Sequence, residues 1–152
     1  MKTTINLLLF ISFLFISCEK KDPDTEKDDD NQQGVVDIRL KGTWQNQAGT
    51  AIYNGDEKGV YLKSTTHAAW LSAIQAELVE YGDAYIKSLK RKSDNEYSCD
   101  ILWFTRTNDV VTEVRYSSKS TITISSDGKR IDISSRSPWD DDLTTSVLIK
   151  QQ

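Results

Sequence analysis

The segment "VVDIRLKGTW" (residues 35–44) is where the folded domain is expected to begin. Apolar and polar residues alternate along it with a period of two. One side of the segment carries, in order, Val36, Ile38, Leu40, Gly42 and Trp44. This alternation is typical of a β-strand with one buried face.

Seven further segments follow the same pattern and are rich in β-branched and aromatic residues. They are residues 59–64, 83–92, 96–105, 110–118, 120–126, 129–135 and 144–150. Turns are expected at residues 54–55, 93–95, 108–109 and 127–128, where Asn, Asp, Ser and Gly gather. Because closure leaves no unpaired strand edge, the pattern predicts a mainly β fold, an antiparallel up-and-down β-barrel of about eight strands.

One segment, "STTHAAWLSAIQAELVEYG" (64–82), has apolar residues at helical spacing instead. It predicts one α-helix over about residues 67–81, with Thr65 or Thr66 as its cap and Gly82 as its end. Its apolar stripe is wide enough to lie across a sheet or over a barrel mouth.

The chain before this domain differs in composition. Residues 1–17 carry Lys2 and then an apolar stretch too short to span a bilayer, which takes about 20 residues, but typical of a signal peptide. Residues 18–34 begin with Cys18 and continue with seven acids, three lysines and no other apolar side chain except Pro23, which predicts an extended tether. Residues 35–152 form the predicted domain. Its sixteen acids nearly balance fifteen bases, so its charge gives no reason to expect nucleic acid as a partner.

The stretch "FISC" (15–18) resembles a bacterial lipobox. The resemblance implies cleavage before Cys18 and lipidation of its sulfur with acyl chains such as palmitate, which would anchor the chain to a membrane. The acidic tether is similar to those of Bacteroidetes lipoproteins exported to the cell surface. This similarity implies an outer-membrane protein that faces outward; a simple spacer on the periplasmic side is the alternative.

The stretch "LKGTW" (40–44), at the start of such a barrel, resembles the lipocalin and fatty-acid-binding-protein superfamily, although "GTW" also opens avidin-type barrels. The resemblance implies that Gly42 lets the strand bend and that Trp44 closes the barrel base beneath a cation, either Arg136 or Lys150. It also implies that the open end admits a small apolar or amphipathic ligand. The inward residues expected to bind it are Tyr97, Ile101, Trp103 and Ile122. The alternative is an accessory lipoprotein with a solid barrel that binds a protein or glycan partner through its outer surface.

Few residues suggest catalysis. His67 is the single histidine and is expected to be solvated, so two histidine ligands cannot meet in one chain. Cys99 alternates with apolar residues and is expected to be a small core side chain. Asp140, Asp141 and Asp142 could bind calcium, but they lack the spaced ligands of a calcium loop and are expected to form a solvated turn. We therefore predict a protein without catalytic residues, cofactor or metal.

The anchor can be tested by growing the host with a radioactive fatty acid. The wild-type chain should take up the label, and Cys18→Ala should lose it, because the thioether is the attachment point for diacylglycerol. Label that survives in Cys18→Ala would contradict lipidation at this residue.

Overall fold

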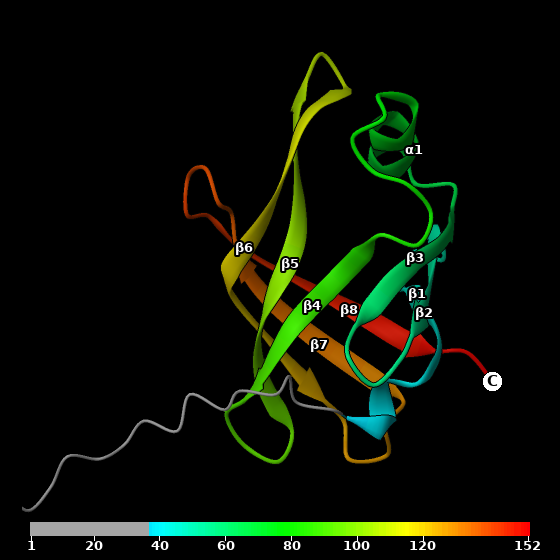
Figure 1. Cartoon of the computed structure of the whole chain (residues 1–152), viewed down its shortest axis with the longest axis vertical. Helices are drawn as coiled ribbons and strands as arrows, with labels where there is room; N and C mark the ends of the chain where they lie inside the picture. The colour runs from blue at the N-terminus through cyan, green and yellow to red at the C-terminus, as the bar shows by residue number, and fades with distance from the viewer. Residues whose placement is uncertain (1–36) are drawn as a thin grey trace, which may run out of the picture. The chain divides into compact units, whose positions relative to one another are not determined.

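The computed structural model describes residues 37–152 (Figure 1). The predicted signal peptide, Cys18, the tether and residues 35–36 lie outside the described residues. The strands are β1 (Gly42–Asn46), β2 (Ala51–Gly55), β3 (Val60–Thr65), β4 (Ala84–Arg91), β5 (Glu96–Thr107), β6 (Val110–Ile124), β7 (Arg130–Arg136) and β8 (Leu143–Lys150). A short 3-10 helix, η1 (Ile38–Leu40), precedes them, and one α-helix, α1 (Ala68–Gln75), lies between β3 and β4.

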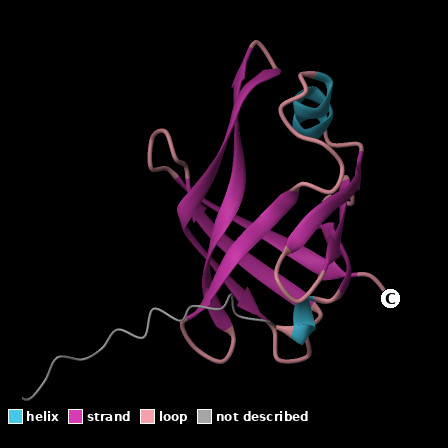
Figure 2. Cartoon of the chain, in the orientation of Figure 1, coloured by secondary structure: helices cyan, strands magenta, loops and turns pink. Residues whose placement is uncertain are grey.

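The eight strands form a closed antiparallel barrel in which each strand pairs with its neighbours along the chain (Figure 2). The barrel closes where β1 pairs with β8, with Trp44 opposite Lys150 and Asn46 opposite Leu148. This confirms the predicted up-and-down β-barrel with one helix. No helix of residues 37–152 is long and apolar enough to cross a membrane.

The predicted strand boundaries were wrong in three places. Residues 38–40 form η1 instead of continuing the first strand, because the Asp37 side chain accepts a hydrogen bond from the backbone N–H of Arg39 and starts a turn. The strand β2 was not predicted, because its Asn54 and Gly55 were interpreted as a turn. Residues 110–118 and 120–126 were predicted as two strands but form the single long strand β6, which ends at Ile124.

Two glycines allow close packing at the barrel base. Gly42 has φ of 134°, a conformation that L side chains rarely adopt. A Cβ at Gly55 would lie 2.0 Å from the carbonyl oxygen of Leu40 and 2.7 Å from Nε1 of Trp44. Gly55 is therefore needed for the approach of Trp44 to β2 and not for a turn.

Trp44 fills the base of the barrel and is fully buried. Its indole Nε1 donates a 2.6 Å hydrogen bond to the carbonyl oxygen of Leu40, which holds η1 across the opening. Of the two predicted cations, Lys150 is the one that lies over the ring, with Nζ 5.1 Å from its centroid. Lys150 also donates a hydrogen bond to the carbonyl oxygen of Arg39. Arg136 pairs with Leu143, at the end of β8 that lies away from Lys150 and Trp44.

A charged network fixes η1 to the turn between β4 and β5. The Asp37 carboxylate, 5% exposed, accepts hydrogen bonds from Arg39 at 2.7 Å and from the Tyr97 hydroxyl at 2.5 Å. Arg39 donates in addition to the side chain of Asn95 at 2.6 Å. The hydrogen bond from Arg39 is the main cause that lowers the pKa of Asp37 to about 2, against the opposing effect of burial. The network therefore requires an ionised carboxylate.

Helix α1 is shorter than predicted, and its predicted cap and end were wrong. His67 is the N-cap without a side-chain hydrogen bond, and Thr65 instead accepts from the backbone N–H of His67. The helix ends at Gln75 because Glu77 adopts φ of 57°, with its N–H donating to Ile74. The next N–H, that of Leu78, donates to the carbonyl of Ala73. These two bonds form a Schellman motif, in which the left-handed position favours glycine.

The lowered pKa of Asp37 makes the free energy of unfolding depend on pH, because the folded chain ionises this carboxyl more readily than the unfolded chain does. The contribution of the ionised Asp37 to stability is complete above about pH 4 and is lost as the pH falls towards 2. We expect Asp37→Asn to lower the free energy of unfolding by about 1–2 kcal/mol at pH 7 and by much less near pH 2. Urea unfolding at both values measures this. A difference that does not depend on pH, or an equal effect from Asp94→Asn on the adjacent exposed turn, would contradict it.

The positive φ of Glu77 leads to a second prediction about stability. Glu77→Gly should raise the free energy of unfolding by about 0.5–1 kcal/mol, because glycine adopts positive φ without a steric cost. Ala76→Gly, one residue earlier at φ of −84°, should lower it by a similar amount. Urea unfolding monitored by tryptophan fluorescence tests both, and equal shifts in the same direction would rule out the Schellman interpretation.

Candidate functional site

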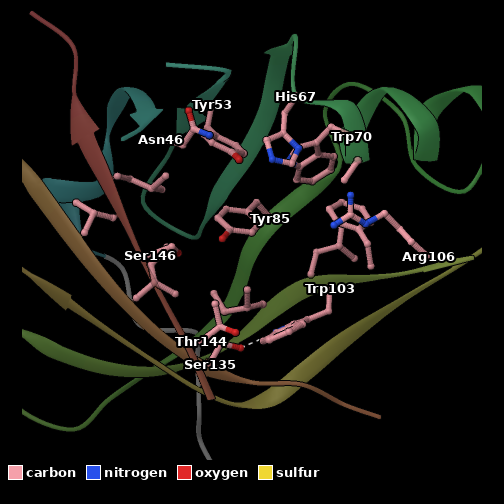
Figure 3. Close-up of a pocket in the computed structure, with 17 residues that line it drawn as sticks. Asn46, Tyr53, His67, Trp70, Tyr85, Trp103, Arg106, Ser135, Thr144 and Ser146 are labelled. Atoms are coloured by element: carbon pink, nitrogen blue, oxygen red, sulfur yellow. Dashed lines mark hydrogen bonds between the residues drawn. The ribbon is translucent and has the colours of Figure 1, made fainter. Parts of the chain in front are cut away.

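The opposite end of the barrel is hollow. A cavity of about 300 Å³ lies at this open mouth, with walls from β1, β2, β4, β5, β7 and β8 (Figure 3). The segment from His67 to Trp70, at the start of α1, forms the remaining side. The fully buried Trp44 fills the opposite end of the barrel, so the cavity lies away from the base.

Aromatic side chains form one continuous wall of the cavity. The rings of Tyr53 on β2 and Tyr85 on β4 are stacked, with centroids 5.1 Å apart. Trp70 meets Tyr85 edge to face at 6.0 Å and Phe104 on β5 at 4.7 Å. Such contacts hold each ring in a fixed orientation and stabilise the fold beyond the burial of apolar area. The wall is therefore preformed.

Helix α1 places Trp70 in this wall. The small residues Ala69 and Ala73 are buried on the same side of the helix, so its backbone comes close to the barrel. The Ser72 hydroxyl, on the same helix, accepts a 2.9 Å hydrogen bond from the backbone N–H of Val111 on β6. The helix is thus tied to the long hairpin of β5 and β6 and covers part of the mouth (Figure 1).

A chain of hydrogen bonds orients Trp103, which lies across the cavity from Trp70 (Figure 3). Its indole Nε1 donates to the Ser135 hydroxyl at 2.6 Å. Ser135 lies 2.6 Å from the Ser120 hydroxyl, which donates to the carbonyl oxygen of Ser117. Since Ser120 has one hydroxyl proton, Ser135 must donate to Ser120, and the chain has a single direction. The hydroxyls of Ser120 and Ser135 are both buried and both engaged in this chain, so their role is to fix the indole.

The polar groups of the cavity are few. Arg106 and His67 reach it from the rim, and Asn46, Ser146 and Thr144 contribute amide and hydroxyl groups. No Asp or Glu of the described part of the chain, residues 37–152, is among the lining residues. Burial raises the pKa values of Tyr53 and Tyr85, so both phenols are neutral at physiological pH.

The structure divides the four predicted ligand residues into two groups. Ile101 and Trp103 line the mouth cavity. Tyr97 points into the base network with Asp37, and Ile122 is fully buried beside Ile133 of β7. Gly42 and Trp44 lie at the base, away from this cavity.

Four other aromatic residues of the cavity were not predicted as ligand residues. Trp70, Tyr85 and Phe104 were recognisable as apolar, but alternation and helical spacing do not say which end of a barrel a side chain reaches. Tyr53 was missed with the strand β2. The strand begins with three apolar residues, Ala51, Ile52 and Tyr53, and this short apolar run is the sequence signal that could have located it.

The remaining candidates for chemistry lie elsewhere. Cys99 is buried, and burial raises the pKa of its thiol to about 12, so it is an unreactive core side chain. Within residues 37–152, no three His, Cys, Asp or Glu side chains are arranged to hold a metal ion. Asp141 instead pairs with Lys119 and Arg136 in the exposed loop between β7 and β8.

Comparisons with models of protein families, with curated proteins and with solved structures gave no match to this chain.

The hydroxyl chain behind Trp103 can be tested by mutation. Ser135→Ala should lower the free energy of unfolding by about 0.5–1.5 kcal/mol, because it removes the acceptor of the part-buried indole N–H of Trp103. It should also speed hydrogen exchange at the Trp103 indole. Ser134→Ala, on the outer face of the same strand, should change stability by less than about 0.5 kcal/mol. Equal effects of the two variants would contradict the proposed role of Ser135.

Proposed function

We propose that the chain is a lipid-anchored envelope lipoprotein that binds a small apolar or amphipathic ligand, without catalysis, in a lipocalin-like barrel. The observation that carries the proposal is the cavity of about 300 Å³ between Trp70 and Trp103. Ligand pockets in proteins begin at about this volume and are lined mainly by apolar and aromatic groups with a few polar ones.

Binding is favoured because the cavity needs little rearrangement. The ring contacts of the aromatic wall and the hydrogen bond from Trp103 to Ser135 set its shape before a ligand enters. A preformed site does not have to be ordered on binding, so more of the contact energy appears as affinity. The same rigid walls would select ligands by size.

The anchor belongs to the same proposal. A lipidated Cys18 followed by an acidic tether would hold the domain at the outer membrane, on the cell surface. A binding domain at that place could capture ligand close to the envelope. A protein or glycan partner on the outer surface is the competing function, and it would not require the cavity.

Native mass spectrometry of the full chain purified from its host tests the ligand directly. We expect a species heavier than the lipidated chain by the mass of one small molecule. Ala69→Phe should reduce this species, because Ala69 lines the cavity and a benzyl group would occupy it. Ala68→Phe, one residue earlier and exposed, should retain it.

Occupancy that is the same in both variants, with both still folded by circular dichroism, would place the ligand outside the mouth cavity. Absence of any bound small molecule in the wild type, together with failure to take up added apolar probes, would favour the competing function of an outer-surface partner.

A further inference from the structure

We infer that the mouth cavity selects planar aromatic anions, carboxylates or sulfonates, over neutral aromatic molecules and over aliphatic acids. The inference rests on the proposed function, because it names the chemical class of the ligand. The charges around the cavity provide the first support for it. Among residues 37–152, Arg106 is the one permanently charged residue in the lining of the cavity, and none of their carboxylates lines it.

Arg106 differs from the other arginines of residues 37–152. Arg39, Arg115, Arg130 and Arg136 all pair with carboxylates. Arg91 lies over the ring of Tyr97 and donates to its hydroxyl.

No carboxylate of residues 37–152 lies within 4.0 Å of the Arg106 nitrogens, which turn towards the cavity (Figure 3). A planar guanidinium offers two parallel N–H groups and matches the two oxygens of a carboxylate or sulfonate. It is therefore available to an anion in the mouth.

The shape and chemistry of the walls indicate what the anion should carry. Five aromatic residues line the same cavity as Arg106, namely Tyr53, Trp70, Tyr85, Trp103 and Phe104. Rings offer both faces and edges, and an aromatic ligand gains stacked or edge-to-face contacts with them that an alkyl chain does not. The volume of about 300 Å³ is small for a ligand pocket and suits one or two fused rings better than a long chain.

The positive charge of Arg106 disfavours aromatic cations that would otherwise fit the cavity as well as aromatic anions do. Aromatic rings attract cations through their faces, so an aromatic wall alone could also bind an ammonium group. Here Arg106 would repel such a ligand, and no carboxylate from residues 37–152 lines the cavity to offset that repulsion. The combination of rings and one free guanidinium therefore favours an anion.

Isothermal titration calorimetry with three probes tests the inference on the purified full chain. The probes are 2-naphthoate, the neutral 2-naphthylmethanol, which has the same rings, and the aliphatic anion decanoate. We expect 2-naphthoate to bind at least tenfold more tightly than either of the others. Arg106→Gln should bring 2-naphthoate to the affinity of the alcohol and leave the alcohol unchanged, and Arg106→Lys should retain part of the difference.

Arg115→Gln is the matched control, because it removes the same charge from the neighbouring strand outside the cavity. It should leave all three affinities unchanged. Equal binding of 2-naphthoate and the alcohol, tighter binding of decanoate, or an equal loss in Arg115→Gln would overturn the anion selectivity while ligand binding stands. Failure of all three probes to bind would overturn the selectivity and count against the proposed function as well.

Discussion

The pairing of β1 with β8 is the constraint on which the rest of the structure depends. It joins the two ends of the meander through three residue pairs, so every strand has two neighbours in the barrel. It also sets Trp44 opposite Lys150 and brings the last strand under η1. Without this ladder, the base of the barrel would not be closed.

The two ends of the barrel use their aromatic residues differently. At the base, Trp44 and Tyr97 are buried with hydrogen-bond partners already within the protein, Leu40 for one and Asp37 for the other. At the mouth, Tyr53, Trp70 and the rings around them contact one another but leave space between opposite walls. The base therefore supplies stability, and the mouth holds the cavity in which we propose that a ligand binds.

Much of the fold could be predicted, because a period of two and turn residues are local signals. The left-handed turn at Asn108 and Asp109 and the hairpin at Gly128 lie where the sequence places them. The expected number of strands was also correct, although one strand was missed and another was counted twice. The errors arose where tertiary contacts override local pattern: Gly55 serves the approach of Trp44, and Glu77 ends the helix although apolar residues continue at helical spacing.

The candidate site was less accessible to sequence reasoning. Alternation shows which side chains point into a barrel but not at what height, so Trp103 and Tyr97, on the same strand and the same predicted face, could not be told apart. Their heights depend on the register between β5 and β6, which shifts between Cys99 and Ile101. The role that we propose for Arg106 carried no sequence signal, because it depends on the absence of a nearby carboxylate among residues 37–152 of the folded domain.

The central claim is that the mouth cavity binds a ligand, and the indole N–H signals of the four tryptophans test it most directly. Nitrogen-15 spectra would be recorded on protein from its host and again after ligand-free refolding. The account predicts that the signals of Trp70 and Trp103 move while those of Trp44, in the base, and Trp139, in the outer loop, stay in place. Four unchanged signals, or a change confined to Trp139, would contradict it.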